Sequence, residues 1–289
     1  MASSSIGRAT VGFAGEPGSF AEDAALAYFT WSTAVALPTF RDVIDSVGEG
    51  MVEAGIVPIE NVVGGTVREV YDLLLDAEVR ITGEVIVPVR LCLAALPGQR
   101  LDEIERVYSH IQALGQAEAY LRQRPWTLLA TTNTAGAGKQ IADRGERGSA
   151  AVLSPRAAAL HGLEVLASDI QSAPENRTRF LVLAAGRSPD SPASLAGVGG
   201  GPMRTTVVLS VRNEPGSLHR VLGVLAAHRL NMSKLESRPG RERAWEYVFW
   251  VDLDADLCAP DARSVLDELR GATAMLRVMG CYPRGEEPR

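Results

Sequence analysis

Cysteine is scarce in this sequence, and the cysteines are widely spaced. The 289 residues include three, Cys92, Cys258 and Cys281, which form no CxxC pair and no His/Cys cluster with metal-ligand spacing. A sparse, odd number of cysteines is typical of proteins in a reducing compartment. Because the cysteines and histidines are not clustered, the sequence predicts no metal site built from them.

Long apolar runs and an excess of positive charge are also missing. No run approaches the roughly 20 apolar residues of a membrane span, and the start, MASSSIGRAT, lacks the apolar core of a secretory signal. The net charge is −6, so no basic field attracts nucleic acid or an anionic membrane. We expect a cytoplasmic protein whose partners are small molecules or other copies of itself.

Several common catalytic motifs do not occur. The sequence has no GxSxG nucleophile elbow, no HExxH motif, no phosphate-binding P-loop and no nicotinamide-binding fingerprint. The four histidines are scattered, and His110 alone lies on a candidate active-site turn. None of these common catalytic motifs therefore offers a convincing mechanism for this sequence.

A stretch rich in Gly, Pro, Ser and Ala, residues 184–204, divides the chain. Such a composition buries little apolar surface and is typical of a flexible connector. We assign residues 1–187 to a first domain, 188–203 to a linker and 204–289 to a second domain.

The two domains differ in their predicted elements. In the first, turns and helical patterns alternate with strand candidates, which predicts an α/β fold; these strands are residues 9–14, 55–59, 84–95, 106–109, 126–131 and 149–153. In the second, strands at 205–211, 232–237, 245–253 and 274–279 and helices at 215–230 and 262–272 give the order βαββαβ. That order predicts a ferredoxin-like sandwich.

Several strand-to-helix turns carry helix-capping signatures. Three of them combine a hydroxyl with an acid or amide three residues later, Ser19 with Glu22, Thr66 with Glu69 and Ser109 with Gln112, and Thr132 and Asn133 are further N-cap candidates. Most caps only stabilise a helix. Several helix starts that face one cleft would, however, bind a small carboxylate-rich metabolite through neutral donors, aided by an arginine.

The stretch SAPENRTRFLVL, residues 172–183, joins a polar run to an apolar strand candidate. By itself it is compatible with an ordinary turn, in which Thr178 is a β-branched residue at the start of a strand. The hydroxyl, amide and guanidinium groups just before the apolar run are also compatible with a functional site.

Six segments in order resemble the bacterial prephenate dehydratase family, in which a catalytic domain precedes an ACT regulatory domain. They are GEPGSFAEDAAL, IVPIENVVGGTV, VYSHIQAL, SDIQSAPENRTRFLVL, PGSLHRVL and LESRP. The resemblance implies a catalytic domain like the type 2 periplasmic binding proteins, with two α/β lobes, crossing strands and a cleft between the lobes. It further implies conversion of prephenate to phenylpyruvate, water and CO2 in phenylalanine biosynthesis, without a metal or redox cofactor.

The same resemblance assigns the catalytic motif to Thr178, Arg179 and Phe180. Thr178 would donate a proton to the leaving hydroxide, while the departing carboxylate supplies the electrons. Arg179 either compensates substrate charge or holds the lobe geometry. Phe180 either packs against the substrate ring or begins the core strand.

Other family positions are expected to position the substrate: Glu60, Asn61, Ser109, His110, Gln112, Thr132, Asn133 and Asn176. Glu60 would repel a dianion, so it could instead order neighbouring donors. Three positions depart from the family pattern, Val62 for Ser, Ile111 for Pro and Arg90 for His. They leave room for arogenate as the substrate, or for decarboxylation without aromatisation, whereas the intact Thr-Arg-Phe motif favours the standard activity.

In the second domain the resemblance implies a site for L-phenylalanine as an allosteric effector. Its residues would be Gly216, Ser217, Leu218, Asn231, Glu236, Ser237, Arg238 and Pro239. Because ACT domains pair side by side, we expect a homodimer at least, with a tetramer as the alternative. A non-catalytic small-molecule sensor is the remaining interpretation, since the same two-lobed scaffold serves binding alone.

Overall fold

The computed structural model describes residues 9–186, 201–240 and 247–285. The described residues within Met1–Ala77 and Val85–Phe180 form one compact unit, and those within Glu78–Glu84 and Leu181–Glu286 form a second. No helix in these ranges is long and apolar enough to cross a membrane. Residues 188–200 of the expected linker lie outside the described residues.

The first lobe contains a sheet with the strand order β2-β1-β3-β11-β5, with β4 beside β3, although residues 79–84 of β5 and 181–185 of β11 belong to the second unit. These strands are β1 (Ala9–Ala14), β2 (Ser32–Leu37), β3 (Ala54–Asn61), β4 (Gly65–Thr66), β5 (Val79–Pro88) and β11 (Arg177–Ala185). Strand β1 pairs in parallel with both β2 and β3. The helices of this lobe are α1 (Phe20–Tyr28), α2 (Phe40–Gly48) and α3 (Arg68–Asp76).

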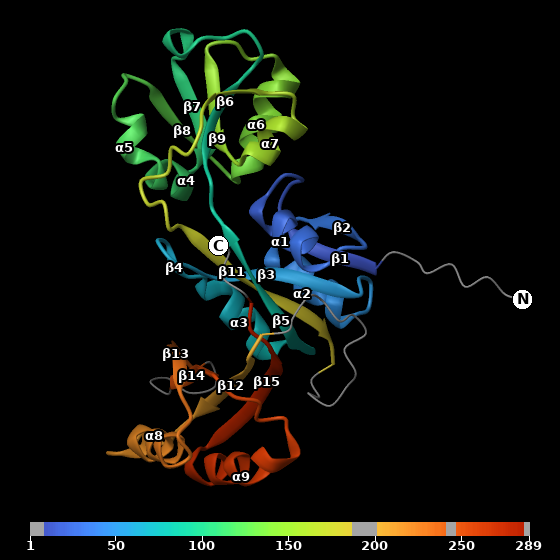
Figure 1. The fold of residues 1–289 in the computed structure, drawn as a ribbon, viewed down its shortest axis with the longest axis vertical. Helices are drawn as coiled ribbons and strands as arrows, with labels where there is room; N and C mark the ends of the chain where they lie inside the picture. Colours follow the sequence, from blue (N-terminus) through green and yellow to red (C-terminus); the bar gives the residue numbers. More distant parts are fainter. Residues whose placement is uncertain (1–8, 187–200, 241–246, 286–289) are drawn as a thin grey trace, which may run out of the picture. The chain divides into compact units, whose positions relative to one another are not determined.

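The second lobe is a three-layer sandwich (Figure 1). Its sheet has the order β10-β6-β9-β7-β8, formed by β6 (Cys92–Ala95), β7 (Arg106–His110), β8 (Thr127–Thr131), β9 (Ser149–Leu153) and β10 (Glu164–Ala167). Successive side chains of β6 point to opposite faces, so Leu93 packs with α4 (Ile111–Gln116) and α5 (Glu118–Leu121). Cys92 packs on the other face with α6 (Thr134–Arg144) and α7 (Pro155–Leu160). A 3-10 turn, η1, spans Leu101–Glu103.

Two segments cross between the lobes. One runs from the end of β5 to the start of β6, and the other from β10 to β11. They are hydrogen-bonded to each other, because Val89 N donates to Asn176 O at 2.8 Å and Ile170 N donates to Leu91 O at 2.9 Å. The two lobes and crossing segments that the family resemblance implied are therefore present.

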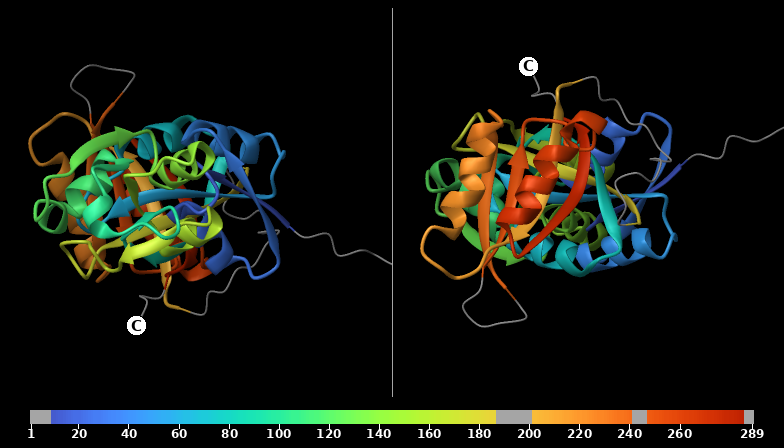
Figure 2. Two further views of the ribbon diagram at one scale, coloured as in Figure 1. Left: turned by 90° about the horizontal axis from the view of Figure 1, so that it is seen from above. Right: turned by 90° about the horizontal axis from the view of Figure 1, so that it is seen from below.

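The second unit contains the predicted βαββαβ element order. Strands β12 (Met203–Ser210), β13 (Met232–Pro239), β14 (Tyr247–Leu253) and β15 (Met275–Pro283) form a sheet ordered β13-β14-β12-β15 with antiparallel pairing. Helices α8 (Ser217–Ala227) and α9 (Arg263–Ala272) lie side by side on one face of it (Figure 2). They bury Val221, Leu225 and Leu269 against β12 and β14. A 3-10 turn, η2, precedes α9 at Pro260–Ala262. The ferredoxin-like prediction is confirmed.

Some local predictions were wrong. The single strand expected over 84–95 is two strands. The helix start expected at Thr66 is at Val67, which makes no side-chain cap, because Thr66 pairs with Glu60 across β3 and β4. Residues 245 and 246 of the strand expected at 245–253 lie outside the described residues.

Two of the three cysteines are bonded to each other, which the sequence did not predict. Cys258 and Cys281 form a disulfide across 23 residues. The sheet explains the pairing, since β15 places Cys281 beside Thr205, whose hydroxyl accepts from Leu257 N at 3.0 Å. Cys92 is a free thiol, and burial raises its pKa to about 11.

Candidate active site

Two adjoining cavities lie within the first unit, between its lobes. The larger, of about 470 Å³, is lined from the first lobe by Phe20 and Asn61, from β11 by Thr178 and Phe180, and from the second lobe by residues that include Gln112. The smaller, of about 210 Å³, shares four residues with it: Phe20, His110, Thr132 and Thr134. Together they form one cleft with contributions from both lobes.

The side chains of the Thr-Arg-Phe motif alternate between the two faces of strand β11. Thr178 and Phe180 are buried and line the larger cavity, because alternate residues of a strand share a face. Arg179 lies on the opposite face and forms an ion pair with Glu60, with Nη2 and Oε2 3.3 Å apart. In the described part of the chain, neither member of this pair lines the two cavities. Of the alternatives for Arg179, this position favours a role in geometry.

Asn61 is the centre of the polar contacts around Thr178. Its Nδ2 lies 2.9 Å from Thr178 Oγ1, 2.8 Å from Asn176 Oδ1 and 3.0 Å from Arg177 O. Its Oδ1 accepts from Gly64 N at 2.6 Å and from Val63 N at 3.1 Å. Both Asn61 and Asn176 are buried, with 7% and 1% exposed.

The smaller cavity is surrounded by helix starts. Ser19, Asn133 and Ser154 are the N-caps of α1, α6 and α7, and each accepts a hydrogen bond from its own helix backbone. All three line this cavity. The remaining free N–H groups of these helices give a partial positive charge without a side-chain cation. Among the described residues that line the two cavities there is no Lys or Arg.

His110, rather than Ser109, caps α4. Its Nδ1 accepts from Gln112 N at 3.3 Å, which leaves Nε2 to carry the proton in the neutral ring. The ring borders both cavities. Ser109 is fully buried and donates to Val152 O at 2.6 Å, because β7 continues one residue further than the sequence suggested.

The lobes touch beside the smaller cavity. Ser154 Oγ donates to Gly18 O at 2.9 Å, and Arg156 pairs with Glu22 at 2.7 Å and with Asp23 at 2.9 Å. Burial raises the pKa of Asp23 in spite of the opposing charge and hydrogen bond of Arg156. Gly18 has φ +88°, and a Cβ there would lie 2.9 Å from Ala157 Cα.

The predicted substrate-site residues fall into two groups. Asn61, His110, Gln112, Thr132 and Asn133 line the cavities, whereas Glu60, Ser109 and Asn176 are not among the described lining residues. Gln116 and Ser154 also line them and were not predicted; the Ser-Pro pair at 154–155 is a helix-start signal that could have indicated the latter. The departures Val62 and Ile111 are 67% and 66% exposed, and Arg90 forms an exposed ion pair with Asp169 at 3.1 Å.

The second unit has its own cavity of about 350 Å³ at the start of α8. Three of the predicted effector residues, Gly216, Ser217 and Leu218, line it together with Arg212, Glu214, Tyr247 and Phe249. Gly216 adopts φ +81° at the helix start, a conformation that favours glycine. The other predicted effector residues lie on or next to the edge strand β13, outside the described lining: Asn231, Glu236, Ser237, Arg238 and Pro239.

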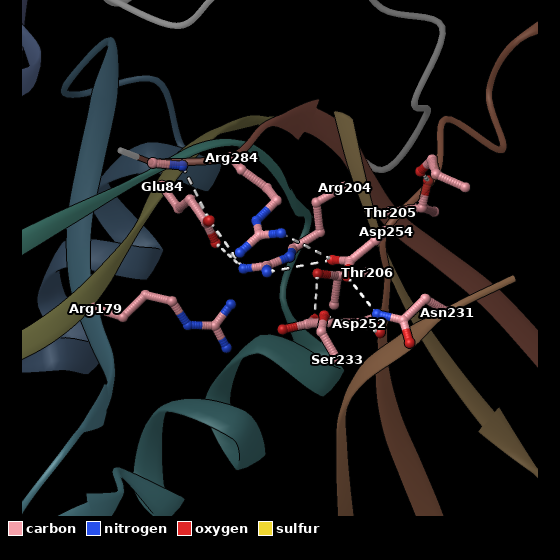
Figure 3. A network of polar contacts seen from close by, with 12 residues as sticks. Glu84, Arg179, Arg204, Thr205, Thr206, Asn231, Ser233, Asp252, Asp254 and Arg284 are labelled. Carbon is pink, nitrogen blue, oxygen red and sulfur yellow. Dashed lines mark hydrogen bonds and ion pairs between the residues drawn. The ribbon is translucent and has the colours of Figure 1, made fainter. Parts of the chain in front are cut away.

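A polar network in the second unit joins Asn231 to strand β5 (Figure 3). Asn231 Nδ2 donates to Asp254 Oδ2 at 2.7 Å, and the other oxygen of Asp254 lies 3.4 Å from Arg204 Nη2. Arg204 Nη1 in turn donates to both oxygens of Glu84, at 2.9 and 2.8 Å. Burial would raise the pKa of Asp254, but the hydrogen bonds of Asn231 and Ser233 and the charges of Arg284 and Arg204 lower it.

Comparison with known proteins shows which families the sequence of this chain matches. The family described as "Prephenate dehydratase" matches residues 11–188, and that described as "ACT domain" matches residues 205–271. An Arabidopsis thaliana protein named arogenate dehydratase/prephenate dehydratase 2, chloroplastic, is 36% identical over 96% of this chain and 73% of its own. A bifunctional chorismate mutase/prephenate dehydratase of Aquifex aeolicus is 34% identical over 95% of this chain and 73% of its own.

Two solved structures are similar over nearly the whole chain. The prephenate dehydratase of Arthrobacter aurescens in complex with L-Phe has a TM-score of 0.84 at 28% identity, covering 97% of this chain and 92% of its own. A protein described as GqqA, a novel type of quorum quenching acylase, has a TM-score of 0.84 at 30% identity, covering 96% of this chain and 98% of its own.

Proposed function

Since this chain belongs to the prephenate dehydratase family, we propose that it converts prephenate to phenylpyruvate, water and CO2. The observation that carries the proposal is the position of Thr178, a hydroxyl-bearing residue that lines a cavity of about 470 Å³ between two lobes. Around it stand amides, an imidazole and helix starts, which are neutral donors suited to a dicarboxylate.

The reaction needs one proton and no external electrons. The bond between the ring and its hydroxyl oxygen breaks, and that oxygen takes a proton and leaves as water. The bond to the ring carboxylate also breaks, CO2 departs, and its electron pair completes the aromatic ring. Thr178 donates to the leaving oxygen, and solvent returns the proton afterwards.

The two cavities fit a substrate with two anionic ends. The helix starts at Ser19 and Asn133 border the smaller cavity and would hold one carboxylate. The Nε2–H of His110 can donate to the same substrate from between the two cavities. Phe180 borders the larger cavity and would pack against the ring.

The first experiment is release of phenylpyruvate from prephenate by the purified protein. We expect turnover, and we expect Thr178→Ala to lower kcat by about 10²- to 10⁴-fold with the fold intact, as measured by circular dichroism. The matched control is Thr178→Ser, which keeps a hydroxyl. Wild-type kcat in Thr178→Ala would refute the donor role.

Arogenate is the second candidate substrate, because several plant relatives carry its name. It differs from prephenate in bearing an amine where prephenate has a keto group. Comparing kcat/KM for the two substrates decides between them. If the chain binds either compound but turns over neither, and Thr178→Val binds equally well, the protein is a sensor and not an enzyme.

Acyl hydrolysis is a further candidate, because of the description of one similar structure. Such a reaction needs a nucleophile activated by a base. His110 Nδ1 is already an acceptor for Gln112 N, and among the described hydrogen bonds none joins a histidine to a hydroxyl of the cleft. We therefore expect no release of amine from an N-acyl amide under conditions where prephenate is consumed.

For the second unit we propose L-phenylalanine as the effector. Its cavity offers Arg212 and Glu214 to the carboxylate and ammonium, and Leu218 and Phe249 to the ring. Binding inhibits only if it differs between two states of the enzyme. Calorimetry with L-phenylalanine tests the binding, and the prephenate assay with added L-phenylalanine tests the coupling. Absence of a binding heat would refute the assignment.

We further propose a homodimer at least, with a tetramer as the alternative. The support is β13, an edge strand that leaves the sheet of the second unit open on one side. Light scattering with and without L-phenylalanine measures the assembly. A monomer under both conditions would refute it.

A further inference from the structure

We propose that Asn61 is a positioning residue that aims the Thr178 proton into the cleft, and is not a ligand of the substrate. This inference rests on the proposed dehydratase function, in which Thr178 is the proton donor. It replaces the expectation that Asn61 itself donates to the substrate.

The orientation of the Asn61 amide follows from its neighbours. Its Oδ1 receives two backbone N–H groups, from Val63 at 3.1 Å and Gly64 at 2.6 Å. If the amide were turned over, its NH2 group would face these two donors. The NH2 group must therefore point the other way, towards Arg177 O and Thr178 Oγ1 at 3.0 and 2.9 Å.

Counting protons then shows that Asn61 has little left for a substrate. The NH2 group has two protons, and three acceptors lie within 3.0 Å of its nitrogen, including Asn176 Oδ1 at 2.8 Å, so one proton is shared between two acceptors. Asn61 is also 7% exposed. Asn176 uses its oxygen to hold Asn61 and is itself 1% exposed, so it supports the same arrangement from behind.

The hydrogen bond from Asn61 determines where the Thr178 hydroxyl proton can point. A threonine hydroxyl has one proton, and an oxygen that accepts from Asn61 cannot direct that proton back at the same group. Within the described residues the Thr178 O–H has no protein acceptor, and its side chain lines the larger cavity. The proton is therefore free for the leaving group. The amide also stabilises the charge that grows on Oγ1 as the proton leaves, which strengthens Thr178 as an acid.

The test replaces the hydrogen-bond donor of the residue 61 side chain by an acceptor, with little change of shape. In Asn61→Asp the ionised carboxylate can only accept, so it captures the Thr178 proton. With the substrate that the wild-type enzyme turns over, we expect kcat of this variant to be lower than that of wild type by about 10²-fold or more. We expect its KM to stay within about threefold of the wild-type value. We also expect kcat to recover as the pH falls below the pKa of the new carboxyl group, because its protonated form can donate again. Wild type lacks this recovery once the uncatalysed rate is subtracted at each pH.

A double-mutant cycle separates positioning from a structural effect. Asn61→Ala should lower kcat by about 10-fold or more in the wild-type background but by less than about twofold in Thr178→Val, where no hydroxyl needs aiming. If Asn61→Asp does not fold, the uncharged variant Asn61→Ala still tests whether Asn61 positions Thr178. Calorimetry with L-phenylalanine and the unfolding temperature serve as controls for the fold.

The outcomes are distinct. Equal losses in both backgrounds, or wild-type kcat in both Asn61 variants of an active enzyme, would overturn the positioning role and leave the dehydratase function standing. A wild-type protein inactive on prephenate and on arogenate would overturn the proposed function, and the inference with it.

Discussion

Replacing Glu84 by Met would remove one partner of an ion pair inside the second unit. The Glu84 and Arg204 side chains are 1% and 7% exposed, and two hydrogen bonds of 2.9 and 2.8 Å join them (Figure 3). Breaking such a pair from one side leaves a buried guanidinium without its main counter-charge, which costs about 3–5 kcal/mol. Asp254 remains 3.4 Å from Arg204, so we expect the lower end, about 3 kcal/mol.

This magnitude can be checked by denaturant unfolding followed with probes in the second unit. In Glu84→Met the free energy of unfolding should fall by about 3 kcal/mol, which at about 4 °C per kcal/mol corresponds to roughly 12 °C in the unfolding temperature for a unit of this size. The double variant Glu84→Met/Arg204→Met removes both charges and should recover most of the loss. A matched exposed pair, Arg90 with Asp169, provides the control: Arg90→Met should change stability by less than about 1 kcal/mol.

Two results would refute this reasoning. One is a Glu84→Met protein as stable as wild type within about 0.5 kcal/mol, which would mean that water reaches the guanidinium. The other is a double variant no more stable than the single one, which would assign the loss to packing and not to charge.

Three further predictions concern other contacts. Thiol titration of the unfolded, unreduced protein should find one free thiol per chain, and reduction of the Cys258–Cys281 bond should lower stability by about 3 kcal/mol through the loop of 23 residues that it closes. Three free thiols per chain would contradict the disulfide. Burial lowers the pKa of His161 below 6.5, so stability is present above the unfolded-state pKa and lost as the pH falls through the folded-state value; His161→Gln should remove this loss in acid unfolding curves. Arg156→Gln should raise KM for prephenate more than it lowers kcat, because Glu22 and Asp23 then no longer hold the lobes together; an unchanged KM would contradict this.

Local patterns predicted many strands but not their neighbours. The runs at 9–14 and 149–153 are strands with the predicted bounds, because short apolar runs between turn signals suit buried strands. The sequence patterns do not predict strand β2 or helix α2. Strand β2 is an edge strand whose residues are half-buried or exposed, so its apolar signal is weak. The disulfide could not be predicted from spacing, since it depends on how β15 pairs with β12.

The site was predictable where the family motif and strand geometry agree. Alternation along β11 already implies that Thr178 and Phe180 share a face and Arg179 takes the other. The role of Ser109 could not be read from the sequence, because the cap position depends on where β7 ends. Asn61 is recognisable in the motif, but its bonds to Asn176 and Thr178 join residues more than 100 positions apart.

The contact between Gly18 and Ala157 has a consequence for solvent. Ala157 leaves no room for even one methyl group on Gly18, so any other residue at this position would wedge the lobes open. Water that entered through such a gap would compete for the N–H groups at the helix starts and weaken electrostatic contacts beside them. The close approach of the two lobes at this point therefore depends on a hydrogen atom taking the place of a side chain.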